Sequence, residues 1–179
     1  MRRFRLPLTA GLALAAVLGL ASCATDVLEP SPPPPPQHGL LGDLLGKVTG
    51  TLLLCAPQTE TTTTKVIGKS GGTIKMGPHT LVIPSGALSS NVTISGTVVR
   101  GIVNSVRLEP HGLKFARKKP ATLTMSYSNC LLKDLPLAKK VAYTSEKLDL
   151  LAILKSLDFA ASDKVETKLD HFSRYAVAY

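Results

Sequence analysis

The side chains that could bind a metal or catalyse a reaction are few in this sequence and lie far apart. Three cysteines are present, and the four histidines are His38, His79, His111 and His171. Histidine metal sites commonly use ligands a few residues apart, so this spacing gives no metal motif. Gly68-Lys69-Ser70 matches only the end of the phosphate-binding loop pattern, because Thr63 stands where the first glycine is required. We therefore expect no metal site and no cofactor.

Composition and charge exclude several classes of protein. The chain has 179 residues, 44% of them hydrophobic and 18% charged, which excludes a wholly disordered chain and a polytopic membrane protein. Its formal net charge of +9 suggests nucleic acid as a partner, but the chain has no tryptophan and only four tyrosines and four phenylalanines. Proteins that bind single-stranded nucleic acid stack its bases on aromatic side chains, so we expect no nucleic-acid partner.

The N-terminus has the pattern of a targeting signal. Arg2, Arg3 and Arg5 form a basic start, and the run from Leu6 to Ser22 carries no charge. This run is shorter than the roughly 20 apolar residues of a membrane span. It suits the apolar core of a signal peptide, so residues 1–22 are not expected to be part of the fold.

Cys23 ends the string Leu20-Ala21-Ser22-Cys23, which resembles the bacterial lipobox. In lipoproteins with that box, the thiol receives a diacylglyceryl group, a peptidase cuts before the cysteine, and the new amine is usually acylated. The resemblance implies a lipid anchor at Cys23 in the cell envelope. Ala24, rather than an aspartate, follows, which implies the outer membrane of a bacterium that has one. An ordinary secretory peptide, with Cys23 as a bystander thiol, is the alternative.

Two cysteines remain once Cys23 is lipidated. Cys55 and Cys130 then make the number of free cysteines even, and in an oxidising compartment an even number favours a disulfide. Such a bond would close a loop of about 75 residues and stabilise the fold by about 4 kcal/mol in the chain-entropy model. Two separate buried thiols are the alternative.

Residues 23–64 have the composition of a tether. Pro30 and the run Pro32–Pro36 predict a polyproline II spacer of about 3.1 Å per residue. Leucine pairs at 40/41 and 44/45 have helical spacing, so this part could rest on lipid or on the folded domain, although its glycines weaken a helix. Thr59–Thr64 is expected to be a loop.

From Lys65 the sequence changes to short β-branched runs separated by glycine and proline. Alternation is clean in residues 122–127, with Leu123, Met125 and Tyr127 on one face. Leu150, Ile153, Leu154 and Leu157 would also fit a helix stripe, but the length of the segment and the β texture around it favour a strand. Many short strands predict an all-β antiparallel β-sandwich over residues 65–179. The expected strands are 65–69, 72–76, 79–83, 91–99, 104–109, 121–127, 140–144, 148–154, 164–169 and 172–178.

A set of strings across this region resembles the ZU-5 domain, the β-sandwich module of ankyrins, zonula-occludens proteins and uncoordinated-type netrin receptors. The resemblance covers about residues 66–179, and it implies a scaffold that binds partners or neighbouring domains without a cofactor. The strings are Gly71-Gly72-Thr-Ile-Lys-Met, His79-Thr-Leu-Val-Ile-Pro84-Ser-Gly86-Ala87-Leu88, Leu108-Glu-Pro110-His111-Gly112-Leu-Lys-Phe115, Lys119-Pro120-Ala-Thr-Leu-Thr and His171-Phe172-Ser173-Arg-Tyr175.

In some relatives the His-Phe-Ser string is a self-cleavage site. Carried over to this chain, Ser173 would be the nucleophile, His171 the base and Phe172–Ser173 the bond that breaks. The alternative is structural, because residues 172–179 also alternate as the last strand of a sandwich would. Cleavage would separate only Ser173–Tyr179 from the rest, whereas relatives use it to separate two modules.

A basic cluster is the remaining candidate site. Lys114, Arg117, Lys118 and Lys119 form it, with Lys139 and Lys140 as possible neighbours. It is either a solvated face or a surface that attracts anionic envelope polymers, an attraction that salt should weaken. Taken together, we expect a non-catalytic, lipid-anchored envelope protein whose sandwich binds another envelope or extracellular protein or polymer.

Overall fold

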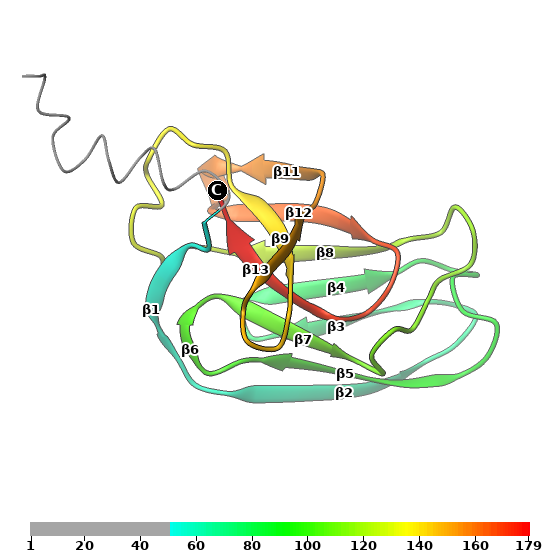
Figure 1. Ribbon diagram of the computed structural model, residues 1–179. Helices are drawn as coiled ribbons and strands as arrows, with labels where there is room; N and C mark the ends of the chain where they lie inside the picture. The colour runs from blue at the N-terminus through cyan, green and yellow to red at the C-terminus, as the bar shows by residue number, and fades with distance from the viewer. Residues whose placement is uncertain (1–50) are drawn as a thin grey trace, which may run out of the picture. The chain divides into compact units, whose positions relative to one another are not determined.

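The computed structural model describes residues 51–179, and the regular structure in this range is β-strand apart from one 3-10 turn, η1 (Ala160–Ser162). The expected signal peptide, Cys23 and most of the expected tether lie outside the described residues. Two antiparallel sheets form the domain, so the all-β sandwich predicted from the sequence is confirmed (Figure 1).

One sheet has six strands and the other five, and every neighbouring pair in both is antiparallel. The first contains, in spatial order, β10 (Leu150–Ile153), β9 (Lys140–Thr144), β13 (Arg174–Ala178), β7 (Ser105–Glu109), β5 (Val92–Val98) and β2 (Thr61–Ile67). The second contains β11 (Ser156–Phe159), β12 (Lys164–Leu169), β8 (Ala121–Ser126), β4 (His79–Ile83) and β3 (Gly72–Met76). A separate ribbon pairs β1 (Leu54–Gln58) with β6 (Gly101–Val103).

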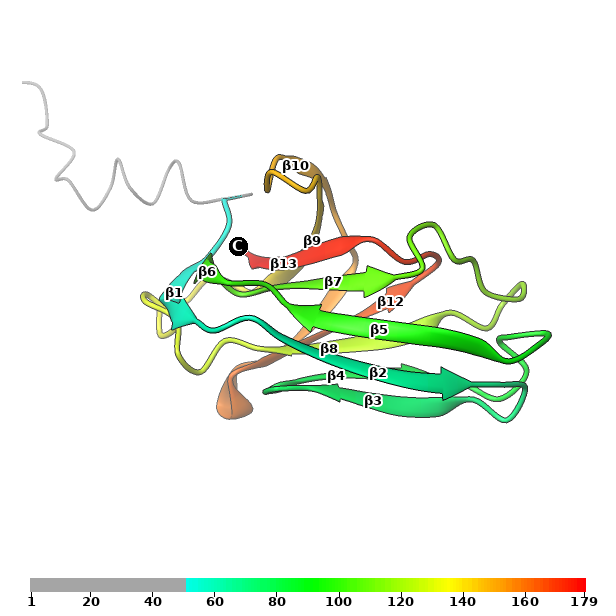
Figure 2. The ribbon, with the colours of Figure 1, turned by 90° about the horizontal axis from the view of Figure 1, so that it is seen from below.

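The core lies between the two sheets, and strand alternation supplies it. In β8, Leu123 and Met125 are fully buried, as the alternation predicted. Both belong to the buried core cluster, and Figure 2 shows the layer of β8, β4 and β3 stacked against the layer of β7, β5 and β2. Close packing also fixes one glycine: a Cβ at Gly96 in β5 would lie 2.2 Å from the sulfur of Met76. Glycine there lets the two sheets approach.

Strand bounds agree closely with the sequence over most of the domain. The predicted ranges 72–76, 79–83, 140–144 and 164–169 are those of β3, β4, β9 and β12. The stretch that also fitted a helix is two strands, β10 and β11, and these cross from the edge of one sheet to the edge of the other. The sequence did not predict β6 and β11 as strands. Both are short and are not central strands of a sheet, so neither has a long alternating pattern of buried residues.

The fold begins before Lys65, which corrects the boundary expected between tether and domain. The segment expected to be a loop at Thr59–Thr64 contains the start of β2, which pairs along its whole length with β5. Threonine hydroxyls bond across this pair, Thr62 to Thr97 and Thr64 to Ser95, each at 2.8 Å. β-branched residues favour strands, and a threonine run is as compatible with an edge strand as with a loop.

The disulfide between Cys55 and Cys130 is present, which confirms the predicted pairing. It joins β1 to the turn that follows β8, and the two segments are also bonded through their backbones. The Leu131 N–H donates to the Leu54 carbonyl at 2.8 Å, and the Ala56 N–H donates to that of Asn129 at 2.9 Å. β1, which precedes residue 65, is therefore fixed covalently to the sandwich.

Candidate functional site

Ser173 lies in the bend just before β13 and is 3% exposed. Its hydroxyl lies 3.2 Å from Nε2 of His111, which comes from the turn after β7. That turn contains a cis peptide bond between Glu109 and Pro110, and the Glu109 carboxylate accepts the N–H of His111. The fold thus places an imidazole beside the serine from a position 62 residues away in the sequence.

The same turn holds the peptide bond before Ser173. The Gly112 N–H donates to the Phe172 carbonyl at 2.9 Å, and the Phe172 N–H donates to the Leu113 carbonyl at 3.0 Å. The Phe172 ring is fully buried and packs edge-to-face on Phe115, with ring centres 5.3 Å apart. A hydroxyl, a base and an N–H on the adjacent carbonyl are the groups that acyl transfer requires.

His171, the base that the resemblance implied, makes different contacts. Its ring packs edge-to-face on Tyr143 at 5.2 Å between centres and lies 6.3 Å from the ring of Tyr175. The Tyr175 hydroxyl donates to the His171 carbonyl at 2.6 Å. The His171 ring therefore packs against aromatic rings, and the imidazole that lies beside the Ser173 hydroxyl is that of His111.

The backbone around the Phe172–Ser173 bond has an ordinary conformation. The non-glycine residues with positive φ in the described part of the chain are Lys118, Leu132, Leu148 and Asp163, and all lie elsewhere. On its C-terminal side the bond leads directly into β13, which pairs with β9 and β7 on its two sides. The site therefore has the groups for acyl transfer, and the carbonyls of both Phe172 and Ser173 accept backbone hydrogen bonds.

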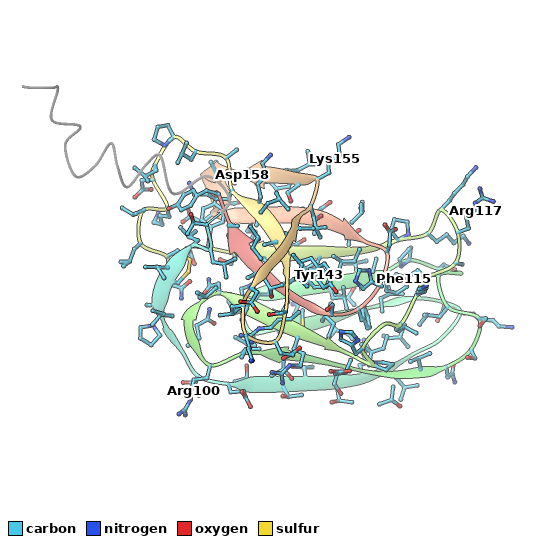
Figure 3. All side chains as sticks on the ribbon, viewed as in Figure 1. Arg100, Phe115, Arg117, Tyr143, Lys155 and Asp158 are labelled. Carbon is cyan, nitrogen blue, oxygen red and sulfur yellow. A yellow bond between two sulfur atoms is a disulfide. The ribbon has the colours of Figure 1, made fainter. Side chains whose placement is uncertain are left out.

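The expected basic cluster divides into two separate places. Lys114, Arg117, Lys118 and Lys119 are all exposed on the loop between β7 and β8, and Figure 3 shows Arg117 extending from this loop. Lys119 Nζ donates to the Ser85 carbonyl at 3.1 Å, and the other three have no ion pair with any described residue.

Lys139 does not belong to this cluster, because it is 2% exposed. Its ammonium donates to the carbonyls of Leu135 and Leu137 at 3.0 and 2.8 Å and lies over the rings of Tyr127 and Tyr179. Burial lowers the pKa of this lysine. It borders a pocket of about 400 Å³, but its donors are already used to hold the loop 131–138.

A buried polar network near the disulfide was not anticipated from the sequence. His79 is fully buried, and its Nδ1 accepts the N–H of Ser126 at 3.1 Å. Asn104 donates to the Ser126 carbonyl at 3.0 Å and to the Asn129 side chain at 2.8 Å, and it accepts from Gln58. Burial lowers the pKa of His79 to about 4, so the ring is neutral at physiological pH. Nε2 has no partner among the described residues.

Large apolar side chains are exposed along β10 and β11. All four residues of β10 are exposed, and Leu157 on β11 is 61% exposed. We call this surface the β10–β11 rim, and its members are Leu150, Leu151, Ile153, Leu157 and Phe159. Figure 2 shows β10 standing out from the rest of the sandwich. The sequence predicted a strand over residues 148–154, with a helix stripe as the alternative, and it said nothing of exposure. Both strands lie at sheet edges, which leaves these side chains uncovered.

Comparison with known proteins adds no family. No protein-family model matches this chain, and no curated protein matches it. Within residues 51–179, no group of three or more His, Cys, Asp or Glu side chains could hold a metal ion. No helix in that range is long and apolar enough to cross a membrane.

Proposed function

We propose that this is a lipid-anchored protein of the bacterial envelope and that its ZU-5-like sandwich is a non-catalytic interaction module. The lipobox-like string ending in Cys23 supports the lipid anchor. The β10–β11 rim is its contact surface for another envelope or extracellular protein. The observation that carries this proposal is that five large apolar side chains are exposed on β10 and β11, two strands that follow each other in the chain and lie at sheet edges. Contiguous exposed apolar patches larger than a few hundred Å² are rare on monomeric soluble proteins and commonly mark binding surfaces.

The position of the rim suits it for this role. β10 and β11 are the outermost strands of their sheets, so neither is covered on its outer side by another described strand. The core does not depend on the rim side chains, since the buried cluster is formed by other residues. Apolar side chains that do not contribute to folding and are held on a fixed backbone are suited to a partner.

The experiment is photo-crosslinking of the full chain in its own cells, with the photoreactive residue placed at Leu151 or Leu157. We expect one specific protein adduct, which should disappear when Leu150 and Ile153 are both changed to Ser. Val66 is the matched control position, because it is 59% exposed on β2 at the opposite edge of the same sheet. Equal adducts at Val66 and Leu157, or no adduct at either rim position, would contradict this function.

Self-cleavage at Phe172–Ser173 is a second candidate, and the contact between Ser173 and His111 favours it. In this reaction Ser173 Oγ bonds to the Phe172 carbonyl carbon while its proton passes to His111 Nε2. The bond from that carbon to the Ser173 nitrogen breaks, the nitrogen takes a proton, and an ester remains. Water then hydrolyses the ester to a Phe172 carboxylate and a free Ser173 hydroxyl. The Gly112 N–H would stabilise the negative oxygen.

Intact-mass measurement tests this second candidate, and it has to be made under denaturing conditions. Because β13 is paired on both sides, a released Ser173–Tyr179 peptide would stay in the sheet under native conditions. We expect His111→Ala to abolish cleavage and His171→Ala to retain it if His111 is the base. A single undivided mass for the natural sequence, with no loss of Ser173–Tyr179, would end this candidate.

A further inference from the structure

A second exposed apolar surface lies at the end of the sandwich that carries the disulfide. We call it the leucine end, and its members are Leu54, Leu131 and Leu132, which are 49%, 62% and 46% exposed. Leu54 and Leu131 lie side by side, because the Leu131 N–H donates to the Leu54 carbonyl at 2.8 Å. The neighbouring Cys55–Cys130 bond holds these two backbone segments together.

The described chain begins at the leucine end. The Thr51 carbonyl accepts the Tyr179 N–H at 3.2 Å, and the Tyr179 hydroxyl donates to the Leu132 carbonyl at 3.0 Å. One tyrosine therefore contacts both the first described residue and the surface. Leu54 is only three residues further along from Thr51. Any segment that precedes Thr51 has to start from this place.

The segment that precedes Thr51 is apolar at helical spacing. Residues 39–50 contain Leu40, Leu41, Leu44, Leu45 and Val48. Leu44 is seven residues from Thr51, which gives a reach of at most about 25 Å when the chain is extended. Gly50 directly precedes Thr51 and can take the backbone angles needed to reverse the chain.

We propose that residues 39–50 dock on the leucine end, with Leu44 and Leu45 against Leu131 and Leu132. Because the two parts belong to one chain and are joined by a few residues, their effective concentration is in the millimolar range, as for short linkers in general, so even a weak apolar contact is populated. Docking removes the exposed leucines from water and shortens the free part of the tether, which leaves Pro30–Pro36 as the spacer. This proposal does not rest on the function assigned to the β10–β11 rim.

The test is photo-crosslinking of the full chain with the photoreactive residue at Leu131, followed by mapping of the adduct by mass spectrometry. We expect an adduct within residues 40–48 of the same molecule, and loss of that adduct when Leu44 and Leu45 are both changed to Asp. Both of those residues lie outside the sandwich, so the domain should fold normally. A melting temperature equal to that of the natural sequence would verify this. The same photoreactive residue at Val66 should give no adduct with residues 40–48.

Three outcomes would overturn the proposal. One is an adduct at Leu131 only with lipid, and another is an adduct only with a second copy. The third is an adduct with residues 40–48 whose yield is unchanged by the two aspartates, since a contact that tolerates two charges is not apolar docking. The rim experiment gives its result independently, because its crosslinking positions, Leu151 and Leu157, lie on different strands from the leucine end.

Discussion

β13 and the β10–β11 rim are both made of short apolar strands, yet they occupy opposite environments. All five residues of β13 are buried, and the strand is hydrogen-bonded to β9 on one side and β7 on the other. All four residues of β10 are exposed, and it pairs with β9 alone. Similar residue types thus support folding in one place and remain free for binding in the other.

The difference comes from position in the sheet more than from composition. A central strand of a sandwich has a sheet neighbour on each side and packs its inner face against the other sheet, so its residues are fixed by several partners at once. An edge strand has one neighbour, and apolar residues there are a hazard for aggregation unless something covers them. Four predictions test how far this contrast holds.

The largest difference is expected between two phenylalanines of the same chain. Phe172, just before β13, is fully buried, whereas Phe159, at the end of β11, is 48% exposed. Phe172→Ala should lower the free energy of unfolding by about 3–5 kcal/mol, because it leaves a cavity in the core. Phe159→Ala should change it by no more than about 0.5 kcal/mol. Urea unfolding of both variants measures this, and similar losses would mean that the rim is part of the core.

The disulfide tests whether β1 behaves like β13 or like the rim. Replacing Cys55 and Cys130 with alanine should lower the free energy of unfolding by about 4 kcal/mol, given the sequence separation of 75 residues between them. Cys55 is buried and β1 is held at both ends, so we expect it to resemble β13. Unfolding of the double variant beside the natural sequence gives the value. If the free energy of unfolding falls by less than for an ordinary surface substitution, β1 contributes as little to stability as the rim.

Acid should lower the free energy of unfolding through His79 in the interior. Burial lowers the folded-state pKa of His79 from 6.5 to about 4, so between these values the unfolded chain binds a proton that the folded domain does not. The free energy of unfolding should therefore fall as the pH drops from about 6.5 to about 4, by up to about 3 kcal/mol from this group.

His79→Asn is the matched control for the acid effect. Its Oδ1 is bonded to Cγ as Nδ1 is, so it can accept the Ser126 N–H, but the amide does not titrate. Urea unfolding at a series of pH values should show a shallower slope for this variant than for the natural sequence over that range. Equal slopes would mean that another group is responsible for the acid sensitivity.

The sequence predicted the interior far better than the surfaces. Clean alternation, as in Leu123 and Met125, reports a face that is buried, and four strand ranges followed from such patterns. The contact between Ser173 and His111 could not be predicted, because it depends on how a turn after β7 meets a bend before β13. Both strings were visible in the sequence, but the family resemblance implied His171 as the base. Which strands would lie at the sheet edges was equally hidden.

The smallest expected effect is that of salt on partner capture, and it separates the rim from the basic loop at Lys114–Lys119. A contact made by leucine and phenylalanine side chains does not depend on charge, so the rim adduct should persist when the salt concentration is raised to 1 M, where the Debye length is about 3 Å. A contact made by Arg117 and Lys118 would weaken strongly under the same conditions. Crosslinking yield at Leu157, measured at low and high salt, gives the answer. The crosslinking yield could instead fall strongly at high salt and also fall when Arg117 and Lys118 are changed to Gln. That result would show that the partner binds the basic loop and not the β10–β11 rim.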